Sequence, residues 1–299
     1  MTDKILKSRE SDFKIIGFLS IGAFAIGSAA ILIRMADANP IVIAAYRMLV
    51  AFVVVIAVSR LKGQSFDTRV GIKDWILLLV SGLFLASHFA LWITSLQMTS
   101  IANSVFLVTT TPLFVLVGAH FKGDRATWAV AFAVLVTIAG GVVLGIGDPS
   151  NGGNSIRGDL LAVAGAIAMA GNLLIGRHLR PRIDLTSYIT IVYLTAFLVL
   201  ILCVLITRAP FLGLPIETYG WIFLAGLIPQ AVGHTTLNWA LAHVSATVVA
   251  LVTRIEPVIA ILLASIFLNE VPHWTVIPGG LLLLLGVVFA FRFEMTKAR

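Results

Sequence analysis

Long apolar stretches occupy most of this chain, and they limit its fold more than any other feature. Helices of about 18 or more apolar residues can cross a membrane. Ten such runs occur, at 15–33, 41–59, 75–96, 102–119, 127–147, 160–176, 186–207, 219–241, 247–268 and 273–291. The connections between them are short, and only 12% of residues are charged, against roughly one quarter in soluble domains. We therefore predict one all-α integral membrane domain with ten transmembrane helices.

The positive charges are concentrated in alternate connections between these runs. If the N-terminus is cytoplasmic, 16 of the 21 lysines and arginines lie inside, 3 lie outside and 2 lie within spans. This asymmetry follows the positive-inside rule. It predicts a multi-pass protein of the cell (inner) membrane with cytoplasmic tails at 1–14 and 292–299. The net charge of +7 is explained by this topology, so no nucleic-acid partner is expected.

The two halves of the chain repeat each other weakly. At offsets of 145 or 146 residues the following pairs align: Trp75 with Trp221, His88 with His234, Pro112 with Pro257, and Gly140 with Gly286. We predict a first repeat at 1–147 and a second at 158–291, joined by an outer linker at 148–157. Because five spans per repeat is an odd number, the second repeat enters the membrane from the opposite face. Such inverted repeats are typical of secondary transporters, whose substrate site lies near the membrane midplane.

Polar residues recur at helical spacing in two of the apolar runs. His88 and Trp92 share one face of the third run. In the eighth run, Gln230, His234 and Asn238 recur every four residues. Polar groups at this depth usually face a bundle interior or a wet cavity, and the alternative is that they hydrogen-bond between helices. We predict that all five contact the substrate, with the Trp92 indole stacking on a flat or cationic group.

Structural roles are assigned to the other tryptophans near span ends and to one asparagine. The tryptophans are expected in the interfacial aromatic belt; they are Trp75, Trp128, Trp221 and Trp274. Asn172 lies among glycines in the sixth run, where helices can approach closely. We expect it to form an interhelical hydrogen bond.

A proline interrupts the fourth and the ninth run, at Pro112 and Pro257. Pro257 removes a hydrogen-bond donor, so the carbonyl of Thr253 loses its helical partner, and the α conformation is disfavoured at Glu256. In membranes such breaks often face a substrate path. We therefore predict helix breaks at both prolines and substrate contacts by Thr110 and Glu256.

Three charged residues inside spans need an explanation, because charge is costly there. Arg254 and Glu256 are two residues apart, so on a helix they point in nearly opposite directions and are not expected to pair. We expect Arg254 to extend toward the cytoplasmic end or to bind a substrate carboxylate. Arg47 is expected to cap carbonyls at the outer gate. Glu256 is a candidate for protonation during transport, with protons as coupling ion; alternatively it accepts hydrogen bonds from the backbone beside Pro257.

Several short motifs resemble, in their order, a known family. They are a proline and an arginine seven residues apart (Pro40, Arg47), the pair Glu256–Pro257, "LNE" at 268–270 and "PGGLLLLLG" at 278–286. Together they resemble the EamA-type drug/metabolite transporters over nearly the whole chain. The first half departs from the pattern, since it has Thr111 before Pro112. The resemblance implies a ten-helix exporter of small metabolites, with aromatic-amino-acid exporters as the nearest likeness.

We therefore expect a secondary transporter that exports small amphipathic metabolites, most of all aromatic or hydrophobic amino acids, by alternating access. Its partners would be this small-molecule substrate and the lipid bilayer. One alternative is a multidrug cation exporter, although run 15–33 lacks the acid that such a site usually has. Another is a membrane-embedded enzyme that uses His88 and His234. Zinc-binding HExxH and P-loop motifs do not occur in the sequence, so no metal or nucleotide cofactor is expected.

Overall fold

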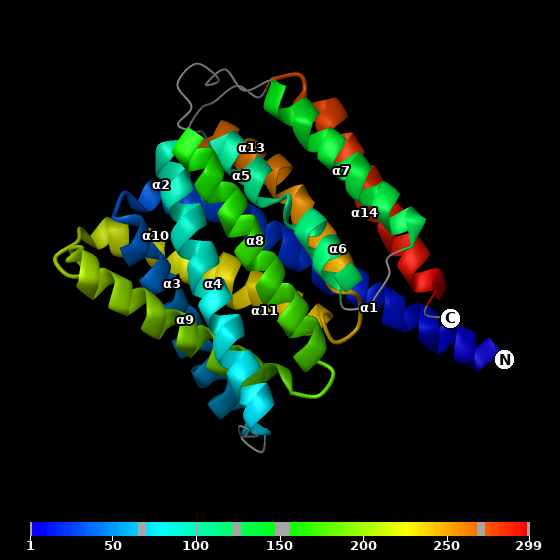
Figure 1. Ribbon diagram of the computed structural model, residues 1–299, viewed down its shortest axis with the longest axis horizontal. Coiled ribbons are helices and arrows are strands. Elements are labelled where there is room, and N and C mark those ends of the chain that lie inside the picture. The colour runs from blue at the N-terminus through cyan, green and yellow to red at the C-terminus, as the bar shows by residue number, and fades with distance from the viewer. Residues whose placement is uncertain are drawn as a thin grey trace.

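The computed structural model describes residues 2–64, 70–99, 101–121, 127–146, 156–267 and 273–297, and the regular structure within them is helical. Ten helical spans correspond to the ten predicted apolar runs (Figure 1). Seven segments are long and apolar enough to cross a membrane, and two shorter apolar helices lie at Trp128–Leu144 and Val276–Ala290. The remaining span, the eighth, is interrupted in its middle. The predicted all-α membrane fold of ten helical spans is therefore confirmed.

Each span consists of one helix or of two or three short ones. The first half contains α1 (Thr2–Gly27) with α2 (Ala29–Ala36), α3 (Pro40–Leu61), α4 (Ile72–Met98), α5 (Ile101–Val108) with α6 (Thr111–Phe121), and α7 (Trp128–Ile146). The second contains α8 (Ile156–Leu179), α9 (Leu185–Thr207), α10 (Ile216–Ala225) with the π-helix η1 (Gly226–His234) and α11 (Thr235–Ala240), α12 (Ala246–Val252) with the 3-10 turn η2 (Thr253–Ile255) and α13 (Glu256–Phe267), and α14 (Val276–Lys297). Helical structure thus continues into both expected tails, whereas linker residues 148–155 and the motif at 268–270 lie outside the described residues.

The fourth span breaks where Pro112 predicted it, between α5 and α6. Thr109 and Thr110 form a turn there instead of continuing the helix. Hydroxyls beside the break donate to the carbonyls that lose a helical partner, Thr109 to Phe106 at 3.0 Å and Thr111 to Val108 at 2.8 Å. These side-chain bonds satisfy part of the polar backbone that the break leaves open, as an apolar environment requires.

The ninth span breaks one turn earlier than predicted. The 3-10 turn η2 precedes Glu256, whose φ of −49° and ψ of −47° lie in the α region. The expectation that Glu256 avoids this region was therefore wrong. The 3-10 turn absorbs the distortion, and Pro257 then lies in the first turn of α13, where a missing N–H costs little. The carbonyl of Thr253 keeps a partner, because the Glu256 N–H bonds to it.

A third break, in the eighth span, was not predicted from the sequence. Nine residues around Pro229 form the π-helix η1, in which hydrogen bonds join residues five apart. Close packing accompanies this break. A Cβ atom on Gly233 would lie 2.6 Å from the Ile26 side chain and 3.2 Å from the Ile26 backbone nitrogen. Only glycine therefore allows α1 to approach η1 so closely.

Specific contacts hold neighbouring spans together. α4 lies along α8, and Asn172 Nδ2 of α8 donates to the Ser81 carbonyl at 3.1 Å and to the Ser81 hydroxyl at 3.0 Å. The predicted interhelical role of Asn172 is confirmed. α7 and α14, the last spans of the two repeats, pack along each other at one side of the bundle (Figure 1).

Each end of α4 contacts a connection between other helices, and these contacts mark the two ends of the bundle. At one end, Arg182 pairs with Asp74 at 3.1 Å, which joins the beginning of α4 to the α8–α9 connection. At the opposite end of α4, Gln97 donates to the Ala38 carbonyl at 2.8 Å. The described ends of α1 and α14 point toward the same side of Figure 1, at the lower right.

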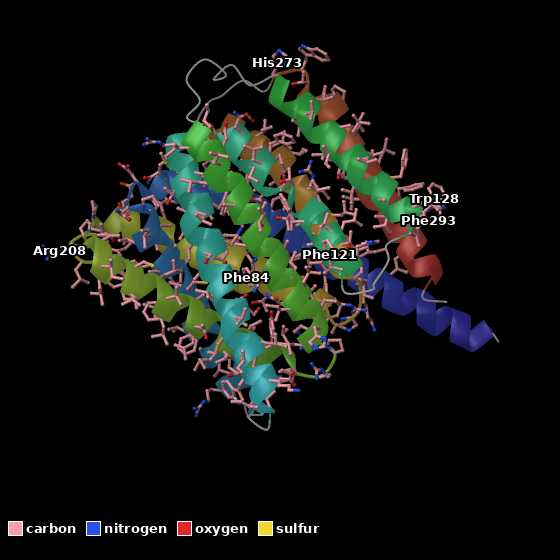
Figure 2. All side chains as sticks on the ribbon, in the orientation of Figure 1. Phe84, Phe121, Trp128, Arg208, His273 and Phe293 are labelled. Carbon is pink, nitrogen blue, oxygen red and sulfur yellow. The ribbon has the colours of Figure 1, made fainter. Side chains whose placement is uncertain are left out.

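The outer surface of the bundle is rich in large apolar side chains. Trp128 and Phe293 lie on the outer side of α7 and α14 (Figure 2), and their ring centroids are 6.1 Å apart. Trp128 and Trp274 are 75% and 70% exposed near helix ends, where the predicted aromatic belt requires them. Such a surface suits contact with lipid.

Candidate functional site

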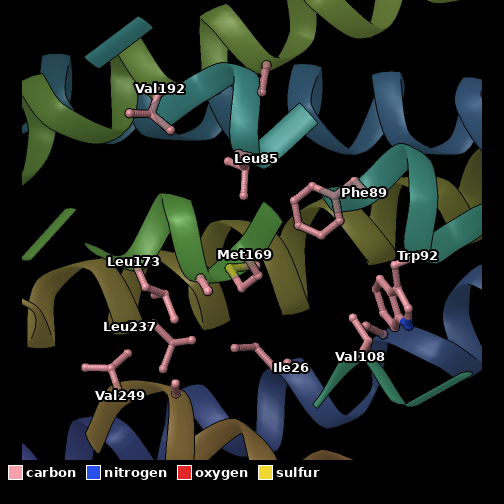
Figure 3. Close-up of a cluster of buried hydrophobic side chains, with 14 of the residues drawn as sticks. Ile26, Leu85, Phe89, Trp92, Val108, Met169, Leu173, Val192, Leu237 and Val249 are labelled. Atoms are coloured by element: carbon pink, nitrogen blue, oxygen red, sulfur yellow. The ribbon is translucent and has the colours of Figure 1, made fainter. Parts of the chain in front are cut away.

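A small cavity lies in the centre of the bundle, where the broken spans meet. Its polar lining consists of His88, Thr109, Thr111, His234, Thr253 and Glu256. Its apolar lining consists of Ile26, Ala29, Trp92, Val108, Met169, Leu173 and Leu237. Figure 3 shows the Ile26, Trp92, Met169, Leu173 and Leu237 side chains converging on this region from different helices. The cavity volume is about 30 Å³, which is room for one or two water molecules.

The two proline breaks supply the cavity with polar groups from both repeats. Thr109 and Thr111 come from the break between α5 and α6, and Thr253 and Glu256 come from the break around η2. Thr110, the residue predicted from this segment, is absent from the lining, and its hydroxyl bonds to the Leu107 carbonyl. Thr109 and Thr111 line the cavity while Thr110 does not, because consecutive residues of a turn face different directions.

The two predicted histidines meet at this cavity. Both rings line it, and their centroids are 6.5 Å apart. His88 Nδ1 lies 2.9 Å from the Gly165 carbonyl; since a carbonyl only accepts, Nδ1 carries the hydrogen, and a neutral ring keeps Nε2 as an acceptor. The Trp92 indole stacks on His88 with 5.9 Å between centroids and 15° between planes. The sequence stripe on α4 therefore corresponds to one wall of the cavity.

The stripe predicted in the eighth span does not form a single face. His234 lines the cavity, whereas Gln230 and Asn238 do not. The π-helix changes the angle per residue, so a spacing of four no longer places side chains in one line. Asn238 Nδ2 instead donates to the His234 carbonyl at 2.8 Å, and the Asn238 carbonyl accepts from Arg180 Nε at 2.9 Å. Asn238 thus stabilises the end of the broken span.

Arg47 is fully buried beside the cavity and does not cap backbone carbonyls at an outer gate, as we had expected. Its Nη2 donates to the side-chain oxygen of Gln230 on η1 at 3.2 Å. Its guanidinium carbon lies 4.5 Å from the Phe89 ring centroid and 5.9 Å from that of Trp92. Nε and Nη1 have no hydrogen-bond partner in the described part of the chain. Because Trp92 lines the cavity, Arg47 lies directly behind its wall.

Arg254 is 1% exposed, so the expectation that it extends toward the cytoplasmic end was wrong. Nη2 donates to the Thr137 carbonyl at 2.7 Å, and Nη1 donates to the Thr109 hydroxyl at 3.0 Å and the Phe106 carbonyl at 3.5 Å. The break before Pro112 frees the Phe106 carbonyl for this contact, because the Thr110 N–H bonds to Leu107 instead. Arg254 therefore links the ninth span to the fourth and fifth and does not line the cavity.

Glu256 is the carboxylate of the cavity lining. Its side chain is 5% exposed, and Oε1 has no hydrogen-bond partner among the described residues. A buried carboxylate oxygen without a donor is costly unless a ligand, water or proton satisfies it. Glu256 is thus available to a cation or a proton that enters the cavity.

Several hydroxyl groups near the cavity were not among the predicted substrate contacts. Thr109, Thr111 and Thr253 line it. Tyr193 lies nearby, with its hydroxyl 3.1 Å from that of Thr235 and 3.4 Å from the Gln230 carbonyl. The position of the threonines beside predicted breaks was a usable signal, whereas Tyr193 has no spacing pattern that distinguishes it.

Hollows also lie toward both ends of the bundle. One, of about 650 Å³, lies between α3 and α9 and extends from Lys62 and Asp184 to Ala231 and Thr235 beside η1. Another, of about 450 Å³, lies at the opposite end, where Asp37 and Gln97 line it. The central cavity lies between these two ends and shares no lining residue with either hollow.

Comparison with known proteins gives consistent results. The EamA-like transporter family matches residues 13–146 and again residues 156–292. The chain is 26% identical over 197 residues to a probable terminal-alkyne amino-acid exporter of Streptantibioticus cattleyicolor, which covers 64% of this chain and 65% of that protein. It therefore spans slightly less than two thirds of that relative's length. An uncharacterised transporter of Synechocystis sp. is 26% identical over 246 residues, with 76% of this chain and 68% of the relative covered.

A likeness in three dimensions supports the fold. A protein of known crystal structure superimposes with a TM-score of 0.78 and 18% sequence identity, covering 96% of this chain and 99% of the other. At this identity the likeness concerns the fold alone.

Proposed function

Because the chain belongs to the EamA-like transporter family, we propose that it exports small amphipathic metabolites, amino acids above all, by alternating access. The observation that carries this proposal is the central cavity, at which helix breaks from both repeats meet. Membrane transporters with inverted repeats place substrate sites at such breaks near the midplane. Membership of a transporter family also makes the chain a transporter and not an enzyme.

Alternating access accounts for the size of the cavity. A volume of about 30 Å³ holds water but not an amino acid, so the spans around it must separate before a substrate enters. The larger hollows at the two ends are candidate halves of the path. We propose that the hollow between α3 and α9 faces the cytoplasm, because the positive charges predict that side for Lys62.

Amino acids fit the chemistry of the cavity wall. Apolar side chains, including Met169 and Leu173, provide a surface for a hydrophobic substrate side chain, and Glu256 provides a charge. Trp92 provides a flat indole on which an aromatic ring stacks favourably. The printed name of one relative, an amino-acid exporter, agrees with this substrate class.

A multidrug cation exporter is the second candidate function. The unpaired Oε1 of Glu256 and the indole of Trp92 line the same cavity, a combination that also suits an organic cation. The two candidates predict different substrates in the same assay.

The test is a counterflow screen with the purified protein in proteoliposomes. Vesicles loaded with one unlabelled amino acid each are diluted into the labelled form, with tetraphenylphosphonium and ethidium as cationic probes and protein-free vesicles as control. Exchange of a hydrophobic or aromatic amino acid, recovered chemically unchanged by mass spectrometry, is the expected result. Exchange of the cations alone would favour the second candidate, and no exchange of any amino acid would refute amino-acid export.

A further inference from the structure

Two opposite charges are buried beside the same cavity, and neither has an ion-pair partner among the described residues. Arg47 is 0% exposed and Glu256 is 5% exposed. Nε and Nη1 of Arg47 and Oε1 of Glu256 make no hydrogen bond with the described part of the chain. Arg47 is nevertheless always a cation under physiological conditions. The site therefore has unused hydrogen-bond donors on a cation and an unused acceptor on a carboxylate.

These two residues do not neutralise each other by direct contact. Within the described residues no ion pair joins them at 4.0 Å or less, although each lies within electrostatic range of the other. Breaking or omitting the partner of a buried charge is costly. A fold that keeps two such charges apart at one cavity suits a ligand that carries both complementary charges.

The positions of the two residues assign an end of the ligand to each. Glu256 lines the cavity directly and, when ionised, accepts N–H bonds only, so it suits an ammonium group. Arg47 provides N–H donors, the geometry that carboxylates prefer. Its guanidinium carbon is 5.9 Å from the Trp92 ring centroid, and Trp92 is part of the cavity wall. If the cavity widens at this wall, Arg47 is the next side chain to line it.

Gln230 holds Arg47 in this position. The amide oxygen of Gln230 accepts from Nη2, so one guanidinium nitrogen is occupied by the π-helix and two remain free for a ligand. The Phe89 ring lies against the guanidinium at 4.5 Å, a cation–π contact that stabilises the charge without using its N–H donors. The arrangement keeps the cation buried and available.

We propose that Arg47 and Glu256 recognise the two charged ends of a free α-amino acid, Arg47 binding the carboxylate and Glu256 the ammonium group. This inference rests on the proposed function, and it specifies the substrate as a zwitterion instead of any amphipathic amine. Compounds that lack either charge leave one buried group unpaired. Loss of a charge-assisted hydrogen bond reduces binding by about 10- to 100-fold.

The first part of the test uses the wild-type protein in the counterflow assay. L-Phenylalanine is compared with 2-phenylethylamine, which lacks the carboxylate, and 3-phenylpropionate, which lacks the amine. If another amino acid is the better substrate, its own decarboxylated and deaminated analogues replace these two. Both analogues should compete at least about tenfold less well than the amino acid. Equal competition by either analogue would overturn the inference even though amino-acid transport stands.

The second part tests whether single substitutions remove the preference for the amino acid over one analogue. Arg47→Gln should weaken competition by L-phenylalanine and leave competition by 2-phenylethylamine unchanged. Glu256→Gln should also weaken competition by L-phenylalanine, but it should leave competition by 3-phenylpropionate unchanged. Arg180→Gln is the matched control, because this buried arginine donates to the carbonyls of Asn238 and Ile183, which are not part of the cavity lining; the ratios between analogues should stay as in the wild type. A uniform loss for all three compounds in both cavity variants would assign Arg47 and Glu256 purely structural roles.

Failure of these variants to fold leaves the inference falsifiable, because the wild-type competition series needs no substitution. If the wild type exchanges no amino acid at all, the proposed function fails, and this outcome is distinct from an amino-acid exporter that does not discriminate between the analogues.

Discussion

The contact between α7 and α14 allows a sharp prediction about how the two repeats are held together. Gly140 of α7 faces Gly279 of α14 at close range. A Cβ atom added at Gly140 would lie 2.8 Å from the Gly279 carbonyl oxygen and 2.9 Å from the Leu283 nitrogen. Both neighbours are backbone atoms, which cannot rotate away as a side chain can. Gly140→Ala therefore forces the two helices apart.

The magnitude follows from this geometry. Ordinary van der Waals contact of a Cβ begins near 3.4 Å, so the Gly279 oxygen must move by 3.4 − 2.8 = 0.6 Å. Overpacking of this kind costs about 1–3 kcal/mol. Replacing a helical glycine by alanine also stabilises the helix by about 0.5–1 kcal/mol. We expect a net decrease of about 0–2.5 kcal/mol in the free energy of unfolding.

A second glycine isolates the steric contribution. Gly220 of α10 is exposed and has no other atom within 4 Å of an added Cβ, so Gly220→Ala should stabilise by the helix contribution alone. The two variants should differ by about 1–3 kcal/mol in unfolding by sodium dodecyl sulfate in mixed micelles, followed by circular dichroism. If Gly140→Ala is as stable as Gly220→Ala, α7 and α14 do not pack as described.

Three further predictions concern transport and topology. Export by Glu256→Gln should no longer respond to an imposed pH gradient, while counterflow at fixed pH remains measurable, because glutamine keeps an acceptor oxygen but cannot bind and release a proton; a retained response would exclude proton coupling through this residue. His88→Leu and His234→Leu should each lower counterflow while membrane expression stays near normal, since both rings line the cavity; two variants that transport normally would refute the assignment. In a background without the native cysteine, a cysteine at Lys62 should react only with reagent that reaches the cytoplasm, and one at Arg208 only from outside; the reverse pattern would contradict the predicted orientation.

Much of the fold was predictable because it depends on local chemistry. A helix that spans a membrane needs only a sufficient apolar length, and each of the ten runs has it. The break at Pro112 was predictable for the same reason, since a proline removes a hydrogen bond wherever it lies. The third break was missed although Pro229 lies inside it, because the spacing of Gln230, His234 and Asn238 was interpreted as that of a regular α-helix.

The candidate site was predicted only in part. His88, Trp92, His234 and Glu256 converge on the cavity as expected. Thr110, Gln230 and Asn238 do not, because a turn and a π-helix redirect side chains that an ideal α-helix would align. Arg254 was misplaced for a different reason, since its partners lie 117 to 148 residues away in sequence.

By itself the sequence determined what each segment is: ten apolar helices, a weak repeat, and a few polar groups at a depth where they need partners. The tertiary structure decided which partners those groups have. Arg47 and Arg254 look alike as buried arginines, but their partners differ. Both terminal nitrogens of Arg254 donate to the fourth and fifth spans, and only Nε lacks a partner among the described residues. Arg47 donates to Gln230 alone and keeps Nε and Nη1 free beside the cavity. Local sequence cannot distinguish them, because a buried charge is satisfied by whichever atoms the packing of distant helices brings within about 3 Å of it.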